Sequence, residues 1–171
     1  MIYMKKVTVS SYRKDKYYPK VVKAIMILLK ESDEISPLAV MLQTGNLLPK
    51  DHEAWLCGHV SYFERVFQGN LSKANRILRI IGFYAHDLNM VPSLHSYQQR
   101  GTKRQLRFSR TCDSGVETAY TQHYRWNQSH EKKQAMIERV LSTIERTRFP
   151  SPHPSGEGMI HDGSGTQEGF Y

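Results

Sequence analysis

Cationic and amide side chains in two segments of the chain have the chemistry needed to bind nucleic acid. Between residues 71 and 88, cations recur at every third residue, and an amide among them could pair with adenine. Residues 100–110 add five cations and no acid. Contacts from such groups to phosphates position a nucleic acid, whereas contacts to base edges read its sequence. The predicted nucleic-acid-binding residues are Lys73, Asn75, Arg76, Arg79, Arg100, Lys103, Arg104, Arg107 and Arg110.

The positive charge of the chain is concentrated rather than evenly spread. The 171 residues carry 24 Lys and Arg against 16 Asp and Glu, a formal net charge of +8. Residues 1–31 hold eight basic and two acidic side chains, and residues 100–110 hold five basic ones. Such clusters attract polyanions, of which nucleic acid is the commonest in a cytoplasm. We expect a nucleic-acid partner, DNA in preference to RNA, although a basic surface that only keeps the protein soluble would show the same excess.

Two histidines support an enzymatic alternative. Imidazoles transfer protons and a nearby cation stabilises phosphate charge, so a small metal-independent ribonuclease could use His95, Arg107, His123 and Tyr124. No fixed spacing connects these residues, and the chain has no Walker loop, G-x-S-x-G elbow or H-E-x-x-H motif. We therefore assign no catalytic residue and expect a non-enzymatic protein. A protein-interaction module or inhibitor, in a phage-defence or toxin–antitoxin setting, is the other alternative.

The two cysteines do not predict a metal centre. Cys57 and Cys112 could bind a metal together with His59 and His123 only if the fold brought all four close to one another. Neither cysteine belongs to the C-x₂₋₄-C spacing that is typical of structural zinc sites. A single pair of cysteines also does not build a disulfide framework. We expect no bound metal and no cofactor.

Helices are predicted where start signals precede an apolar repeat. Pro19, Ser36-Pro37 and Pro49 each open one, and glycines end the second and third at Gly45 and Gly58. The strongest repeat places apolar side chains at spacings of three and four from residue 71 to residue 88. One face of that helix would form the centre of the core, and the opposite flank would carry the candidate cations.

A β-hairpin is predicted to present the second cationic segment. Leu94–Tyr97 and Leu106–Ser109 flank a turn at residues 100–103 that contains a glycine. Because side chains alternate along a strand, Leu106 and Phe108 would face inward and Arg107 outward. The hairpin would therefore hold its cations toward solvent.

Capping boxes predict further helices on both sides of these elements. Ser61 with Glu64 starts a helix near Tyr62, and Ser114 with Glu117 starts one that continues through Tyr124. A final helix begins at Ser129 and carries an apolar stripe. That stripe either packs on the core of the chain or forms a homodimer, and it consists of Met136, Ile137, Val140, Leu141 and Ile144.

This element order predicts a mainly α fold with one β-hairpin, a winged-helix-like α+β domain followed by a C-terminal helix and a disordered tail. A winged helix places its recognition helix directly before the hairpin, so residues 71–88 would be the second member of a helix-turn-helix. Arg65 departs from that motif, which usually has a small residue there. The predicted divisions are a basic arm 1–17, a helical domain with the hairpin 18–126, an amphipathic C-terminal helix 127–149 and the disordered tail 150–171.

No segment predicts contact with a membrane. The longest uninterrupted apolar run is Ala24 to Leu29, which is far below the length that crosses a bilayer. The first residues also lack the apolar stretch of a signal peptide. We therefore expect a cytoplasmic protein.

Several short motifs resemble those of a widespread family of small uncharacterised bacterial proteins. The resemblance covers about Tyr18 to Tyr124, departs from the family at Ser61 (usually proline), Cys57 (usually basic) and Cys112 (usually glycine), and implies a bacterial intracellular domain without a known activity. The matching residues are Ser36-Pro37, Trp55, Gly58, Tyr62, Glu64, Asn70-Leu71-Ser72-Lys73, Pro92-Ser93, Leu106-Arg107-Phe108-Ser109, Ala119-Tyr120 and His123-Tyr124.

Overall fold

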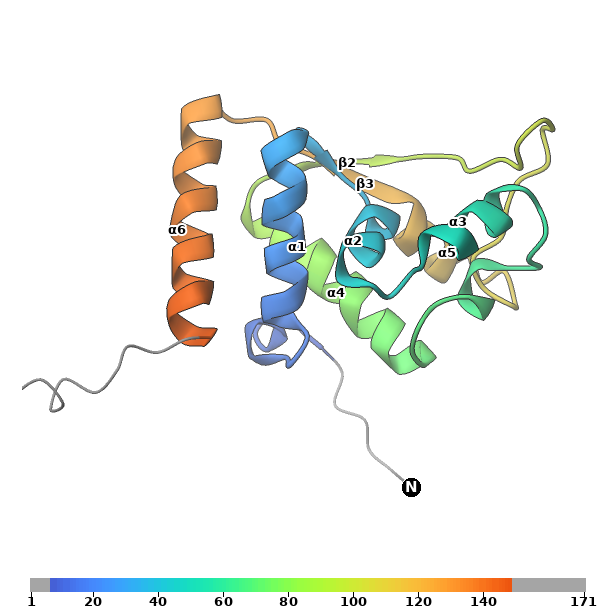
Figure 1. Ribbon diagram of the computed structural model, residues 1–171, viewed down its shortest axis with the longest axis horizontal. Coiled ribbons are helices and arrows are strands. Elements are labelled where there is room, and N and C mark those ends of the chain that lie inside the picture. The colour runs from blue at the N-terminus through green and yellow to red at the C-terminus, as the bar shows by residue number, and fades with distance from the viewer. Residues whose placement is uncertain (1–6, 149–171) are drawn as a thin grey trace, which may run out of the picture.

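The computed structural model describes residues 7–148 and has a mainly α, α+β fold, as predicted (Figure 1). Six α-helices and a small antiparallel sheet account for the regular structure of this part of the chain. The predicted disordered tail, residues 150–171, lies outside the described residues. The elements, two of them 3₁₀ turns (η), are η1 Tyr12–Lys14, α1 Tyr18–Glu31, β1 Glu34–Ile35, α2 Pro37–Thr44, α3 Pro49–Leu56, η2 Phe63–Arg65, α4 Leu71–Asp87, β2 Val91–Leu94, α5 Ser114–Thr121, β3 Gln122–Arg125 and α6 His130–Arg148.

The local start and stop signals determine the helix ends. The Ser36 hydroxyl accepts a hydrogen bond from the Ala39 amide at 3.1 Å, which caps α2. Gly45 follows α2 with φ +82°, in the left-handed region that glycine adopts without strain. The Asn70 side chain caps α4 by accepting from the Lys73 amide at 2.8 Å. The helices predicted from Ser36-Pro37 and over residues 71–88 are therefore confirmed.

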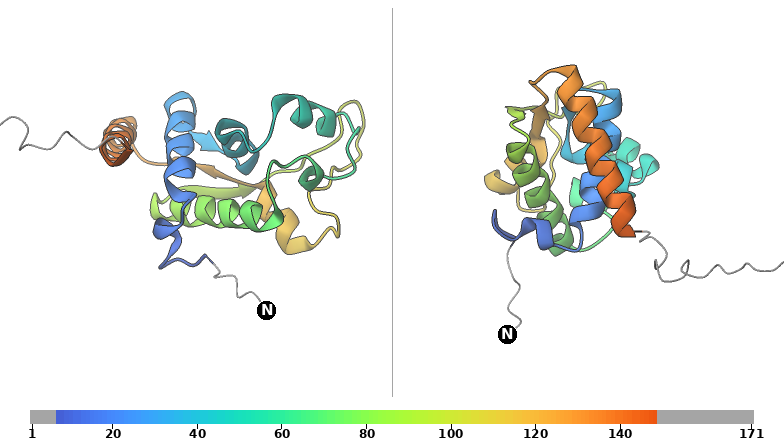
Figure 2. Two further views of the ribbon diagram at one scale, coloured as in Figure 1. Left: turned by 60° about the horizontal axis from the view of Figure 1, so that its bottom comes forward. Right: turned by 90° about the vertical axis from the view of Figure 1, so that its left-hand side faces the viewer.

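Helices α1 and α4 form the centre of the core. Helix α1 contacts α2, α4, α6 and β1, and its side chains Ile25, Met26 and Leu29 are fully buried. The apolar face of α4 is buried as its repeat predicts, with Ile77 and Ile81 each 1% exposed. Figures 1 and 2 show α6 alongside α1 at one end of the molecule. Residues 95–113 lie at the opposite end, together with α3.

The sheet joins three short strands from distant parts of the chain in the order β1-β3-β2. In its antiparallel register Glu34 lies opposite Arg125, and Ser93 lies opposite His123. The helix predicted from Ser114 through Tyr124 was therefore too long, because α5 ends at Thr121 and the chain continues as β3. The reason is that the backbone of residues 122–125 pairs with β1 and β2 on either side.

The predicted hairpin is present only as a turn. One isolated antiparallel bridge joins Gln98 to Gln105, and Leu106 donates its amide to the Tyr97 carbonyl at 2.8 Å. Leu94 is not part of it, because it pairs with Gln122 in the sheet. Leu106 and Phe108 are buried and Arg107 is exposed, as predicted.

The helix predicted to start near Tyr62 does not form. The chain makes only the 3₁₀ turn η2 there, since the Phe63 and Glu64 amides donate to the carbonyls of Arg107 and Phe108 at 3.0 and 2.9 Å. The Glu64 carboxylate does not close a capping box but accepts from the Tyr120 hydroxyl at 2.8 Å. The predicted helix-turn-helix therefore lacks its first helix, because an irregular segment precedes α4.

The described part of the predicted basic arm places two side chains, Val7 and Tyr12, in the core. Tyr12 is 1% exposed, and its ring packs against Tyr18 and Phe83 at centroid distances of 5.7 and 5.6 Å. Its hydroxyl donates to Asp87 at the end of α4, and Arg13 pairs with the same carboxylate at 2.9 Å. Both contacts hold the pKa of Asp87 below its usual value. Residues 7–17 therefore pack against α1 and α4.

The apolar stripe of α6 packs mainly on the chain itself. Met136 and Ile137 are 5% and 2% exposed, and Lys133 is buried with its ammonium group 2.6 Å from the Asp33 carboxylate. Val140, Leu141 and Ile144 are half-buried. Met136 and Ile137 are therefore covered by the chain itself, and a homodimer through the stripe stays a prediction. Among residues 7–148, no helix is both long and apolar enough to cross a membrane.

Candidate functional site

Residues 98–110, here called the basic loop, project at the end of the molecule away from α6 (Figure 1). The turn within it is closed by the Gln99 amide, which donates to the Arg104 carbonyl at 2.8 Å. All five of its cations are exposed, and they are Arg100, Lys103, Arg104, Arg107 and Arg110. The loop therefore presents positive charge on a defined backbone.

A buried aromatic cluster anchors the basic loop. Phe108 is 1% exposed, and its ring lies 4.9 Å from those of Trp55 and Tyr120 and 5.5 Å from those of Phe63 and Tyr97. The Trp55 indole also donates to the carbonyl of Arg107 at 2.9 Å. Aromatic contacts of this kind are worth about 0.5–1.5 kcal/mol each beyond their buried area. The cluster therefore fixes the C-terminal half of the loop.

A carboxylate from α5 holds the same half of the loop. Glu117 accepts hydrogen bonds from the Phe108 amide at 2.9 Å and from the amide and hydroxyl of Ser109 at 2.7 and 2.9 Å. In the capping box predicted from the sequence, Glu117 would serve its own helix. Instead, Asp113 caps α5 by accepting from the Val116 amide at 3.1 Å.

Most of the loop cations have no acidic partner. Arg100 pairs with Glu53, and the Arg107 guanidinium donates to the Arg110 carbonyl. Within residues 7–148, no ion pair is formed by Lys103, Arg104, Arg107 or Arg110. Four exposed cations of the basic loop are therefore available to an anionic partner.

The predicted nucleic-acid-binding residues on α4 differ in their exposure and in their partners. Arg76 is bound to the buried Asp15 carboxylate at 2.7 Å and lies over the Tyr17 ring, as does Lys73. Asn75 and Arg79 are exposed and line a groove of about 900 Å³ between α4 and α5. The structure thus keeps Asn75 and Arg79 open to solvent and neutralises Arg76.

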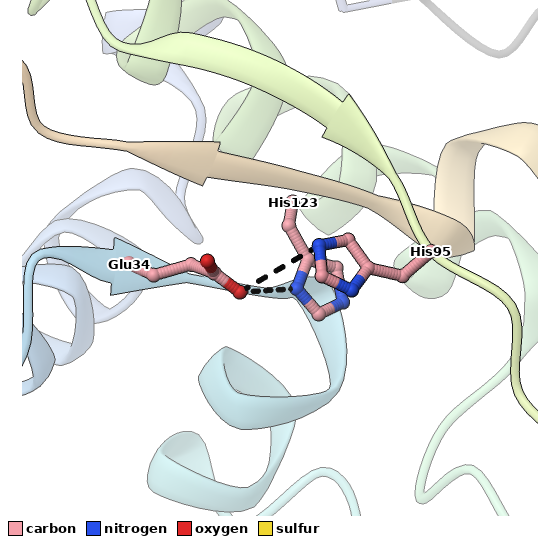
Figure 3. Close-up of side chains that lie close together, drawn as sticks. All are labelled: Glu34, His95 and His123. Carbon is pink, nitrogen blue, oxygen red and sulfur yellow. Dashed lines mark hydrogen bonds and ion pairs between the residues drawn. The ribbon is translucent and has the colours of Figure 1, made fainter.

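The sheet register brings three further polar side chains onto one face. Residues directly opposite in an antiparallel pair share a face, as do residues two apart on a strand. Glu34 lies opposite Arg125, which is two residues from His123, and His95 follows Ser93, the partner of His123. The three side chains Glu34, His95 and His123 therefore meet beside the N-terminus of α2 (Figure 3).

These three side chains, here called the polar cluster, lie within hydrogen-bonding or ion-pairing distance. His123 Nδ1 is 2.7 Å and His95 Nε2 is 3.8 Å from Glu34 Oε2. The imidazoles of His95 and His123 stack at a centroid distance of 3.7 Å and an interplanar angle of 12°. The Glu34 and His95 side chains are 43% and 42% exposed, so the polar cluster is open to solvent.

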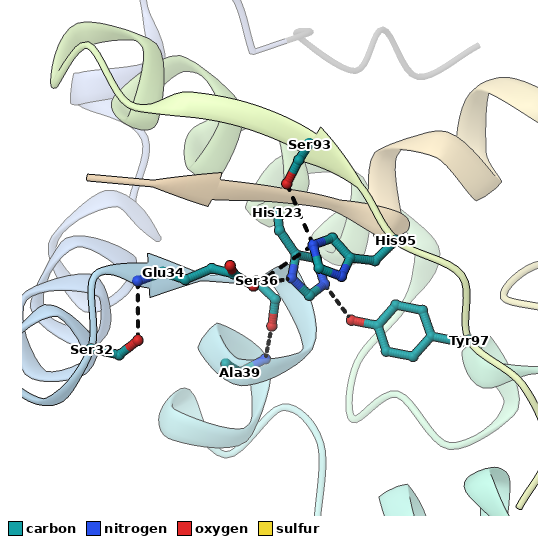
Figure 4. A network of polar contacts seen from close by, with 8 residues as sticks. All are labelled: Ser32, Glu34, Ser36, Ala39, Ser93, His95, Tyr97 and His123. Carbon is teal, nitrogen blue, oxygen red and sulfur yellow. Dashed lines mark hydrogen bonds and ion pairs between the residues drawn. The ribbon is translucent and has the colours of Figure 1, made fainter. Parts of the chain in front are cut away.

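A chain of hydrogen bonds continues from the polar cluster into the core (Figure 4). The Tyr97 hydroxyl lies 2.7 Å from His123 Nε2 and is also hydrogen-bonded to Ser36. Burial raises the pKa of Tyr97, which the Ser36 hydrogen bond partly offsets, and the hydrogen bond from His123 lowers the pKa of Glu34. Since an ionised carboxylate only accepts, His123 Nδ1 donates to Glu34, and in a neutral imidazole Nε2 then accepts from Tyr97.

Of the four residues predicted for a ribonuclease site, the structure brings the two histidines together and places the other two elsewhere. His95 and His123 are in contact, whereas Tyr124 lies on the other face of β3, where its hydroxyl approaches Gly82 of α4. Arg107 belongs to the basic loop. Sequence reasoning missed Glu34, because the two residues of β1 show no pattern.

The four residues considered for zinc do not form one site. Cys57 lies at the end of α3 and is half-buried, and Cys112 is exposed in the segment that follows the basic loop. Among the described residues, only the polar cluster groups three side chains able to bind a metal. Cys112 has φ +56°, in the left-handed region that favours glycine, the residue that the family resemblance expects there.

No protein-family model, curated protein or solved structure matches the chain. The resemblance to uncharacterised bacterial proteins therefore stays a prediction.

Proposed function

We propose that the protein binds nucleic acid, DNA in preference to RNA, in the cytoplasm and without chemical conversion. The observation that carries this proposal is the basic loop, in which four exposed cations have no acidic partner within the described part of the chain and buried aromatic side chains fix the C-terminal half of the backbone. Fixing the backbone lowers the entropy lost when the cations meet phosphates. A regulator or a mobile-element accessory protein would use such a loop.

The groove beside α4 gives this proposal a second contact surface. Arg79 and Asn75 line it, and Asn75 has the amide that pairs with adenine. Arg76 contributes little, because its charge is balanced by Asp15. We infer that phosphate contacts come chiefly from the basic loop. Base contacts, where they occur, come from α4.

Binding of duplex DNA by the full chain should weaken with salt, and the double variant Arg104→Ala, Arg107→Ala should reduce this dependence. Losing two phosphate contacts makes the slope of log affinity against log salt shallower by about 1.8. Fluorescence anisotropy between about 50 and 200 mM salt measures that slope.

The matched control removes two exposed cations from α6, at the opposite end of the molecule. Lys132→Ala with Arg146→Ala changes the net charge equally and should leave the slope close to that of the wild type. Equal slopes for both double variants would show that the basic loop does not contact DNA.

A second candidate function is cleavage of RNA, which the contact between His95 and His123 favours. His123 could accept the proton of a ribose 2′-hydroxyl at Nε2, where that hydroxyl replaces Tyr97 and Glu34 keeps its bond to Nδ1, while the exposed His95 protonates the leaving oxygen. Tyr97 and Glu34 hold His123 in place, while His95 is exposed. The cluster also lies at the base of the basic loop, since Tyr97 directly precedes it.

Under this second proposal, His123→Ala should lower the rate of RNA cleavage by about 10²–10⁴-fold, because it removes one proton-transfer group. The assay uses the full chain, single-stranded RNA and a metal chelator. His86→Ala, an exposed histidine on α4, is the control and should cleave at the wild-type rate. Undiminished cleavage by His123→Ala would exclude the polar cluster as the source.

A further inference from the structure

We propose that Glu34, His95 and His123 form a binding site for a divalent first-row transition metal, for which Zn²⁺ is the probe. Their ligand atoms, one carboxylate oxygen and two imidazole nitrogens, all lie within 4.8 Å of one another. Imidazole and carboxylate together suit zinc and its neighbours, whereas calcium and magnesium prefer oxygen ligands alone. The donor set therefore indicates the class of metal.

The two donor separations from Glu34 lie on either side of those in a tetrahedral site. Metal–ligand bonds of about 2.0–2.2 Å place two ligand atoms of a tetrahedron about 3.3–3.6 Å apart. The observed separations from Glu34 Oε2 are 2.7 Å to His123 Nδ1 and 3.8 Å to His95 Nε2. The shorter one spans a hydrogen bond, whose proton the metal would replace.

One of the three side chains must turn to complete the site. The imidazoles are nearly parallel, so their nitrogen lone pairs point alongside one another rather than toward one point. His95 is 42% exposed and directly follows β2, and apart from the stack and the Glu34 contact its ring is held, among the described residues, only by a 3.4 Å hydrogen bond between Nε2 and the Ser93 hydroxyl, so it can tilt toward Glu34 once that bond breaks. His123, at 12% exposed, is held by Tyr97 and stays in place.

Tyr97 supplies the outer contact that metal-binding histidines require. A ligating imidazole usually has its second nitrogen hydrogen-bonded, which fixes its tautomer and orientation. Here Nε2 of His123 contacts the Tyr97 hydroxyl at 2.7 Å, which leaves Nδ1 to face the other two ligands. Metal at Nδ1 moves the imidazole proton to Nε2, so the Tyr97 oxygen becomes the acceptor of that hydrogen bond. The hydrogen bond between His123 and Tyr97 thus reverses its direction, and its two partners stay the same.

The site would keep one coordination position open. Three protein ligands are typical of zinc sites that bind water or a substrate in the fourth position, whereas structural sites have four. The exposure of Glu34 and His95 gives solvent and small anions access to that position. The metal site itself depends on the polar cluster and not on nucleic-acid binding.

The test is calorimetric titration of the metal-free full chain with Zn²⁺ alone. We expect binding of one equivalent, weakened by at least about 10-fold in Glu34→Gln and in His95→Ala, and about 10-fold in Tyr97→Phe, which removes the hydroxyl of the outer contact but no metal ligand. The control His86→Ala should bind like the wild type. Co²⁺ substituted for Zn²⁺ should show the visible absorption of a four-coordinate site and lose it in His95→Ala.

Two results would overturn the proposal. One is the absence of Zn²⁺ binding by the wild type. The other is unchanged affinity in Glu34→Gln and His95→Ala, which would place the metal elsewhere, for example on His153 and His161 beyond residue 148. Both variants alter exposed side chains, and circular dichroism verifies that they fold. DNA binding measured with a chelator present separates failure of this proposal from failure of the nucleic-acid proposal.

Discussion

Phe108→Ala is expected to lower the free energy of unfolding by about 3–5 kcal/mol, the range for a large aromatic removed from a packed core. Phe108 is 1% exposed and contacts four aromatic rings, so truncation leaves a cavity that several neighbours line. Its backbone amide also donates to Glu117. Urea unfolding followed by circular dichroism measures the difference, read from the midpoint at an unchanged slope.

The same substitution should weaken DNA binding, although Phe108 does not lie on the surface. Arg107 and Arg110 flank the anchored segment, so loosening Phe108 lets both cations sample many positions and raises the entropy lost on binding. The control is Leu94→Ala, which truncates a side chain that is 67% exposed and should change the free energy of unfolding by less than about 0.5 kcal/mol. A wild-type midpoint for Phe108→Ala would show that the aromatic cluster does not support the fold.

The parts of the fold that the sequence predicts are those determined by neighbouring residues. The side chains that cap α2 and α4 accept hydrogen bonds from amides only three residues further along the chain. The glycine after α2 adopts its left-handed conformation without a distant partner. Their apolar faces follow from the helical repeat. The exposure of Arg107 between Leu106 and Phe108 follows from alternation within four residues. All of these signals lie within one or two turns of chain.

The sheet could not be predicted in this way. Its strands have two to four residues each and begin at residues 34, 91 and 122, so no single segment shows a sustained alternation. Strand β2 contains Pro92 and is exposed throughout, a pattern that resembles a loop. Since the polar cluster exists only through the register of these strands, Glu34 could not be identified as the partner of His95 and His123.

Ion pairs explain why only part of the predicted basic surface is available. Asp15 neutralises Arg76 across 61 residues of sequence, and Glu53 pairs with Arg100 across 47. Spacing along a helix or in a loop predicts that such cations are at the surface, but not which acidic side chain the fold brings beside them. The remaining loop cations were identified correctly as exposed, and their binding role stays a proposal.

Neither predicted capping box forms, and the physical reason is the same for both. The sequence assigns Glu64 and Glu117 to their own helix starts, but each carboxylate accepts from a distant segment instead. Glu117 satisfies three donors of the basic loop, including the amide of the buried Ser109. Removing an ionised acceptor leaves these donors without a partner in a region of restricted solvent access.

Glu117→Ala is therefore expected to lower the free energy of unfolding by about 3–4 kcal/mol, since hydrogen bonds to a charged group contribute about 1.5–3 kcal/mol each and water recovers part of the loss. Glu117→Gln should lose less, because its amide oxygen still accepts while its NH₂ group faces a donor. The control Glu131→Ala removes an exposed carboxylate from the first turn of α6 and should cost at most about 1 kcal/mol. Urea unfolding ranks the three variants, and amide exchange at Phe108 and Ser109 reports the loop directly. If Glu117→Ala unfolded at the same urea concentration as Glu131→Ala, then α5 would not hold the basic loop, and the rigid presentation of its cations would need another source.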